Sequence, residues 1–201
     1  MSERTRLTRT EISWILYDVA NSAFIMLVST TIPIFFANLV EEAGMDTTTA
    51  SGLWGLVTAV AVLILAVMSP ILGAVADYKG MKKKLFIGFL AMGLLGAVGL
   101  ACTGSWLAFL AIFVVARLGY SACNVFYDSM LTDVTTDERM DMVSSHGYAW
   151  GYLGSCAPFI AGIVVLFLTG MSGTGFRISF LIKIFLEENS TTFVGEKKAD
   201  F

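Results

Sequence analysis

Two stripes of polar residues inside long apolar stretches are the positions in this sequence best placed to do chemistry. In the first stripe, Asp18, Asn21, Ser22, Ile25 and Ser29 recur at three- and four-residue spacing, which places them on one face of an α-helix. An ionised side chain inside a membrane span costs about 2.5–3.5 kcal/mol on insertion scales, so one that is retained usually faces water or a partner. Two interpretations of Asp18 stay open. It is either an ion or proton site in a cavity wall, or an interfacial aspartate that caps a helix or hydrogen-bonds to a neighbouring helix.

The second stripe consists of Arg117, Ser121, Asn124 and Asp128, with Tyr120 and Tyr127 alongside. This spacing again selects one helical face. Arg117 lies deep in its apolar stretch, where an unpaired guanidinium is costly, so it needs a carboxylate, a cluster of carbonyls or a bound solute. Together the stripes predict a pathway for a small solute or a coupling ion, such as a proton, lined by Asp18, Asn21, Arg117, Asn124 and Asp128.

The remaining reactive side chains do not form a catalytic pattern. His146 is the only histidine, and its ordinary pKa near 6.5 would suit a pH switch, although a lone histidine is more often an interfacial residue without such a role. Cys102, Cys123 and Cys156 lie inside apolar stretches without paired spacing, so we expect three small buried residues. The sequence has no nucleotide loop, zinc signature or nucleophile motif. We therefore expect no enzyme, no catalytic residues, no cofactor and no metal.

The composition indicates which solvent surrounds these stripes. Hydrophobic residues make up 56% of the 201 residues and charged residues 14%, and the mean hydropathy is +0.76. Soluble domains are about half apolar and a quarter charged. The sequence therefore predicts an integral membrane protein in contact with the lipid bilayer. The near-neutral net charge of −3 and the lack of a basic face argue against nucleic acid as a partner.

The apolar stretches define the expected helices. Five are long enough to cross a bilayer, which takes about 20 helical residues, and they cover 12–39, 51–76, 85–102, 106–130 and 144–168. Barrel strands would be about half this length, so we expect an all-α membrane protein. A sixth stretch, 176–186, is interrupted by Arg177 and Lys183 and is an incomplete helix. The expected division is a cytoplasmic segment 1–11, a helical bundle 12–186 and a polar tail 187–201.

Charged loops set the expected orientation. Basic residues in short loops are retained on the cytoplasmic side, and the segment before the first stretch carries Arg4, Arg6 and Arg9. The loop 40–50 is acidic, whereas the loop 78–84 holds four lysines. The amino terminus and the loop 78–84 are therefore expected in the cytoplasm, in the plasma or inner membrane, or at a vacuolar membrane in a fungus. The loop 132–143 should lie on the same side.

A motif marks the turn between the second and third expected helices. It runs from Gly73 through Asp77 and Gly80 to Lys82 and Lys83. A glycine permits close helix approach, Gly80 suits a turn with positive φ, and the Asp77 carboxylate suits the amino terminus of a neighbouring helix. These five residues form a candidate gating motif.

The motif resembles the loop signature of the major facilitator superfamily, from which it departs at Tyr78 and Met81, where arginines are usual. The segments 14–24, 126–128 and 147–155 are similar to the branch related to the autophagy-associated vacuolar amino-acid effluxers and their bacterial relatives. The resemblance implies twelve helices in two halves, a central cavity and alternating access. It also implies amino-acid export by a secondary transporter of small solutes.

The resemblance covers about residues 12–168 and therefore one half of such a transporter. We expect a truncated or frame-shifted chain whose partner is the missing carboxy-terminal half. Two alternatives stay open. The chain is either the amino-terminal half of a transporter, or a membrane fragment or scaffold that does not transport.

Overall fold

The computed structural model describes residues 6–78, 80–170, 172–178 and 181. All regular structure in these residues is helical, which confirms the predicted all-α class. The elements in chain order are α1 (Arg9–Met26), the π-helix η2 (Leu27–Thr31), α2 (Ile32–Glu42), α3 (Thr47–Ala76), α4 (Met81–Cys102), α5 (Trp106–Ser129), α6 (Leu131–Val134) and α7 (Asp137–Leu168).

Four of the described helices, α3, α4, α5 and α7, are long and apolar enough to cross a membrane. The first expected span, 12–39, is instead divided among α1, η2 and α2. The sixth expected stretch, 176–186, lies largely outside the described residues, and the tail 187–201 lies wholly outside them. The count of five clear spans and an incomplete sixth is therefore not confirmed.

The π-helical turn in the first span has a local cause. Pro33 occupies the first turn of α2, and proline has no N–H to donate to the preceding turn and crowds the carbonyl four residues back. The hydroxyls of Ser29 and Thr30 donate to the carbonyl oxygens of Ile25 and Met26, at 2.9 and 2.5 Å. Such interruptions rewind a helix locally without breaking it.

The segment 132–143, which the sequence suggested as a loop, is mostly helical. α6 ends at Val134 and α7 already begins at Asp137. Asp137 and Glu138 lie in the first turn of α7, where the helix macrodipole favours negative charge. Their polarity therefore marks a helix start rather than a loop.

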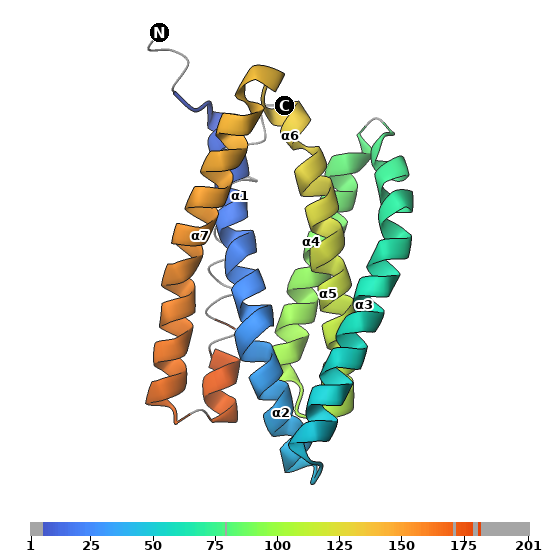
Figure 1. Ribbon diagram of the computed structural model, residues 1–201, viewed down its shortest axis with the longest axis vertical. Helices are drawn as coiled ribbons and strands as arrows, with labels where there is room; N and C mark the ends of the chain where they lie inside the picture. Colours follow the sequence, from blue (N-terminus) through green and yellow to red (C-terminus); the bar gives the residue numbers. More distant parts are fainter. Residues whose placement is uncertain (1–5, 79, 171, 179–180, 182–201) are drawn as a thin grey trace.

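The helices pack in two groups. α1 lies along α7, α4 lies along α5, and α3 packs against α5, as Figure 1 shows. The start of α1, α6 and the turn between α3 and α4 lie at one end of the bundle, and the turn between α2 and α3 lies at the other (Figure 1). This arrangement agrees with a shared side for the amino terminus and the loop 78–84, while the side of the membrane stays a prediction.

Small residues bring the helices of each pair close together. A Cβ on Gly96 of α4 would lie 2.6 Å from the Cβ of Ala116 on α5. On α7, a Cβ on Gly154 would lie 2.3 Å from a methyl group of Val19 on α1. Membrane helices use such small-residue surfaces to pack backbone against backbone. Gly154 therefore serves helix packing.

One expectation about packing is wrong. Cys123 is buried, but Cys102 and Cys156 are exposed on the described surface. The apolar character of a stretch shows that its residues avoid water, and a lipid-facing position satisfies that requirement as well as a buried one. The sequence could not separate the two.

Candidate functional site

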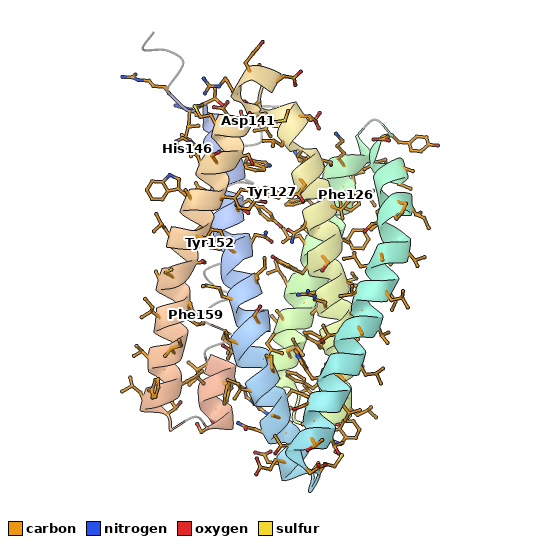
Figure 2. All side chains as sticks on the ribbon, in the orientation of Figure 1. Phe126, Tyr127, Asp141, His146, Tyr152 and Phe159 are labelled. Atoms are coloured by element: carbon orange, nitrogen blue, oxygen red, sulfur yellow. The ribbon has the colours of Figure 1, made fainter. Side chains whose placement is uncertain are left out.

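A cavity of about 330 Å³, lined by both polar and apolar side chains, lies between α1, α5 and α7. Figure 2 labels Tyr127 on α5 and Tyr152 on α7, which both line it. Its volume falls in the lower part of the range of small-molecule sites. The lining residues are Trp14, Asp18, Asn21, Ser22, Ile25, Met26, Asn124, Tyr127, Asp128, Leu131, Ser144, Tyr148, Tyr152 and Ser155.

The two predicted stripes meet in this cavity only in part. Asp18 and Asn21 line it from α1, and Asn124 and Asp128 line it from α5. The helical periodicity of each stripe explains why the residues of one helix point the same way. Arg117 does not belong to the lining. Four of the five predicted pathway residues are therefore brought together.

Glycines on α7 make room for the Asp18 carboxylate. A Cβ on Gly151 would lie 3.0 Å from Asp18 Oδ2 and 2.9 Å from Ser22 Oγ, and one on Gly147 would lie 3.5 Å from Asp18 Oδ2. Both distances at residue 151 are closer than nearly all real Cβ contacts. A glycine at this position therefore lets α1 bring Asp18 against α7 without displacing the carboxylate.

Two asparagines of the cavity lining have buried acceptor oxygens without a hydrogen-bond partner among the described residues. Asn21 is only 7% exposed, and its Oδ1 has no hydrogen-bond partner among the described residues, nor has Oδ1 of Asn124. The Tyr120 hydroxyl donates to the backbone carbonyl of Asn21 at 3.1 Å and holds this part of α1 against α5. An unsatisfied buried acceptor costs free energy of about 1–3 kcal/mol. The cavity therefore favours a ligand that donates hydrogen bonds.

An aromatic pair forms one wall of the cavity. The rings of Trp14 and Tyr127 stack with centroids 4.5 Å apart. Trp14 Nε1 donates to the Tyr127 carbonyl at 3.3 Å, and the Tyr127 hydroxyl donates to the Trp14 carbonyl at 3.1 Å. These reciprocal bonds fix both rings between α1 and α5. The helical stripes did not include Trp14, although it lies one turn before Asp18 on the same helical face.

Arg117 lies on the same face of α5 as Asn124 but about two turns earlier in the helix. Arg117 is therefore further from Asp128 than Asn124 is. It is half-buried, and no hydrogen bond or ion pair joins it to another residue in the described part of the chain. Seven residues at about 1.5 Å per residue separate it from Asn124 by about 10.5 Å along the axis. Its role in the pathway stays a prediction.

The candidate gating motif lies at the turn between α3 and α4. Gly80 has a φ of 78°, the positive value expected for a glycine turn. Lys82 Nζ bonds Asp133 Oδ2 of α6 at 2.9 Å and the carbonyl of Ser129 at 3.3 Å. The lysine therefore ties the start of α4 to the end of α5.

The other residues of the motif have open surroundings. Asp77 and Lys83 are exposed, and no described atom lies within 4 Å of a Cβ built on Gly73. The close helix approach expected at Gly73 therefore does not occur within the described residues.

His146 lies near the start of α7, where Figure 2 labels it. Its Nδ1 lies 2.8 Å from the carbonyl oxygen of Met142, one turn earlier on the same helix. The ring is half-buried and is not part of the cavity lining. A role as a pH switch stays a prediction.

A buried ion pair joins the starts of α1 and α7. Glu11 is 1% exposed, and its carboxylate accepts hydrogen bonds from Arg139 Nη2 at 2.8 Å and Nε at 2.9 Å. The Thr135 hydroxyl adds a bond at 2.6 Å. The Arg139 guanidinium is the main reason why the pKa of Glu11, which precedes the apolar span, is lowered to about 2. This pair closes the same end of the α1–α7 contact that borders the cavity.

The sequence contained a local signal for Glu11. The Thr8 amide donates to Glu11 Oε2 at 2.7 Å, and the Glu11 amide donates to Thr8 Oγ1 at 3.2 Å. This reciprocal arrangement is a capping box, which the pattern threonine, two residues, glutamate predicts. The partner Arg139 could not be read from that pattern, because it lies far along the chain.

Comparisons with known proteins identify the family of the chain. The family model described as vacuole effluxer Atg22 like matches residues 47–187. An uncharacterized MFS-type transporter of Bacillus subtilis (strain 168), YxiO, is 42% identical over 166 residues, which cover 81% of this chain and 39% of the relative. The chain thus spans about two fifths of the length of that relative. No solved structure matches this chain. The chain belongs to the Atg22-like family of vacuole effluxers, within the major facilitator type of membrane transporters.

Proposed function

We propose that this chain forms the amino-terminal half of a secondary-active transporter that moves small solutes by alternating access. The observation that carries the proposal is the cavity between α1, α5 and α7, where Asp18 and Asp128 lie within otherwise apolar helices. Ionisable residues at such positions are costly and usually mark a solute or ion pathway. Transporters of this architecture place their solute sites between two helical halves near the middle of the membrane.

We further propose amino acids as the solutes and export as the direction. The description of the family as vacuole effluxers supports export, and the sequence resemblance to amino-acid effluxers motivates the solute class. The protein would lie in the plasma or inner membrane with its amino terminus in the cytoplasm. A proton is the proposed coupling ion, because two carboxylates line the cavity and can accept one.

A second helical half is the proposed partner. Leu56, Leu63 and Val67 on α3 are exposed to between 62% and 66%, and the position beside Gly73 is open. Apolar side chains on a membrane helix can face either lipid or another helix, whereas an open glycine favours a close helix contact. We propose that the second half packs on the face of α3 formed by Leu56, Leu63 and Val67 and around the open position of Gly73, which lies roughly a quarter turn from that face.

The turn between α3 and α4 is the proposed cytoplasmic gate. Lys82 would hold α4 against α6 through Asp133, while the exposed Asp77 would pair with a helix amino terminus of the second half. Replacing Asp77 by Ala should reduce transport more than protein abundance, since the carboxylate biases one gate conformation. Undiminished transport would contradict the gating role.

A chimeric carrier tests the proposed function. This chain replaces the matched segment of the Bacillus subtilis relative, and the purified carrier is placed in liposomes loaded with a panel of labelled amino acids. Efflux of at least one amino acid that is faster than from loaded liposomes without protein supports the proposal. If efflux requires an inward proton gradient, a proton is also supported as the coupling ion.

Two controls decide the negative outcome. The unaltered relative shows whether the panel contains a transported solute, and the abundance of the chimeric carrier in the liposomes shows whether it has folded. A well-folded chimera that fails with a solute that the relative transports would contradict the proposal. It would favour the alternative of a membrane fragment or scaffold.

A further inference from the structure

The cavity between α1, α5 and α7 has an excess of hydrogen-bond acceptors. Among the described residues, its lining contains the carboxylates of Asp18 and Asp128 and no lysine, arginine or histidine. Asn21 lines it while only 7% exposed, and its Oδ1 has no partner among the described residues. Oδ1 of Asn124 is unpartnered in the same sense. A ligand that donates hydrogen bonds and carries positive charge would complement this lining.

The aromatic wall favours an organic cation. The rings of Trp14 and Tyr127 stack on each other, and Tyr127 also packs beside Tyr17 and is only 4% exposed. The rings with accessible surface are therefore Tyr148 and Tyr152 on α7, which line the cavity and are 65% and 67% exposed. A cation near such a face is stabilised by the ring quadrupole. The apolar area also suits a carbon skeleton attached to the cation.

We propose that this cavity is a binding site for the ammonium group of an organic amine, held between the Asp18 and Asp128 carboxylates with the asparagine oxygens as further acceptors. The proposal rests on the proposed function, because it names the chemical class of solute for the same cavity. Asp18 is the stronger ligand. It is half-buried, whereas Asp128 is exposed, and a charge pair that is less exposed to water is screened less.

The spacing along α5 separates this site from any carboxylate of the solute. Arg117 lies eleven residues from Asp128, about 16.5 Å along the helix axis at about 1.5 Å per residue. The ammonium and carboxylate groups of an α-amino acid share one carbon atom, so they cannot reach both residues in this conformation. The amine is therefore recognised independently, and a simple monoamine should bind.

Calorimetric titration of the purified full chain in detergent tests the site with three probes that share an aromatic body. The probes are 2-phenylethylamine, the neutral 2-phenylethanol and the anionic 3-phenylpropionate. The amine should bind, and the alcohol and the acid should bind at least about tenfold more weakly, which is the change expected for losing one charge-assisted contact. Binding of the acid or the alcohol as tight as that of the amine would overturn the proposal.

Matched variants locate the binding. Asp18→Asn keeps the shape of the side chain and should weaken amine binding by about tenfold or more, whereas Asp128→Asn should weaken it less. Asp141→Asn removes an exposed carboxylate of α7 outside the cavity lining and should leave binding unchanged. Gly151→Ala, which would press on Asp18 Oδ2, should weaken binding while Gly88→Ala should not. Thermal unfolding of each variant confirms that it is folded.

The outcomes separate this inference from the proposed function. Absent amine binding, or binding that survives Asp18→Asn, overturns the ammonium site even if the chimeric carrier transports a solute. Amine binding with the expected variant pattern supports the site even if the chimeric carrier shows no flux.

Discussion

Replacing Glu11 by Gln should destabilise the chain, because the carboxylate joins the start of α1 to the start of α7. Glu11 is 1% exposed and accepts bonds from Thr8, Thr135 and Arg139. A glutamine has one acceptor oxygen where the carboxylate has two. Its amide N–H groups would lie against groups that now donate to Glu11, which they cannot accept from. Losing hydrogen bonds to a charged group costs roughly 1.5–3 kcal/mol, and screening by solvent favours the lower end.

The effect should depend on pH in a defined direction. The pKa of Glu11 is lowered from its ordinary value of 4.5 to about 2 in the folded protein, mainly by the hydrogen bond from Arg139. A lowered pKa contributes stability that is fully present above the unfolded value and is lost as the pH falls through the folded value. The contribution of Glu11 is therefore complete above about pH 4.5 and declines towards pH 2.

Thermal unfolding in detergent, followed by circular dichroism, measures both effects. At pH 7 the Glu11→Gln variant should melt about 3–6 °C below the original chain, and the gap should narrow between pH 4.5 and pH 2. Glu42→Gln, at an exposed position on α2, is the matched control and should show no gap. Equal melting temperatures at pH 7, or a gap that stays constant down to pH 2, would refute the reasoning.

Three further predictions concern packing, topology and the pathway. Gly96→Ala should destabilise by about 1–3 kcal/mol in thermal unfolding because its Cβ would meet α5, whereas Gly88→Ala, with open space around it, should not. In a background without other cysteines, a membrane-impermeant thiol reagent added outside intact cells should label Glu42→Cys and not Lys83→Cys. The opposite labelling pattern would contradict the expected topology. Arg117→Lys in the chimeric carrier should lower the flux of a carboxylate-bearing solute at unchanged abundance, since lysine lacks bidentate geometry. Undiminished flux would remove Arg117 from the pathway.

Helical periodicity predicted much of the candidate site. Asp18, Asn21 and Ser22 share a face because they are three and four residues apart, and Asn124 and Asp128 do so for the same reason. All five line one cavity. Periodicity predicts the site here because a polar residue in a membrane span is costly in lipid and usually faces a cavity or another helix.

Contacts between distant segments could not be predicted in the same way. Periodicity indicates which residues of a helix share a face, but not which helix that face meets. The stack of Trp14 on Tyr127 and the pair of Glu11 with Arg139 each join residues more than a hundred positions apart. The sequence therefore did not indicate that Trp14 contacts Tyr127 or that Arg139 pairs with Glu11.

The division of the first span had a local signal that hydropathy alone does not weigh. Pro33 removes a backbone donor in the second half of the span, and the preceding hydroxyl residues can bond back to the helix. A count of apolar residues treats this stretch as one uniform helix. The structure instead has α1, η2 and α2 in succession.

The most direct test of the central claim asks whether solute passes through the cavity between α1, α5 and α7. Asn124→Cys is introduced into the chimeric carrier without other cysteines, and efflux of a transported solute is measured before and after modification with a thiol reagent. Modification of residue 124 should abolish efflux, because the attached group would block the cavity. Saturating solute should slow the modification, because the solute and the thiol reagent would occupy the same space. Full efflux after complete modification would contradict the assignment of this cavity as the solute pathway.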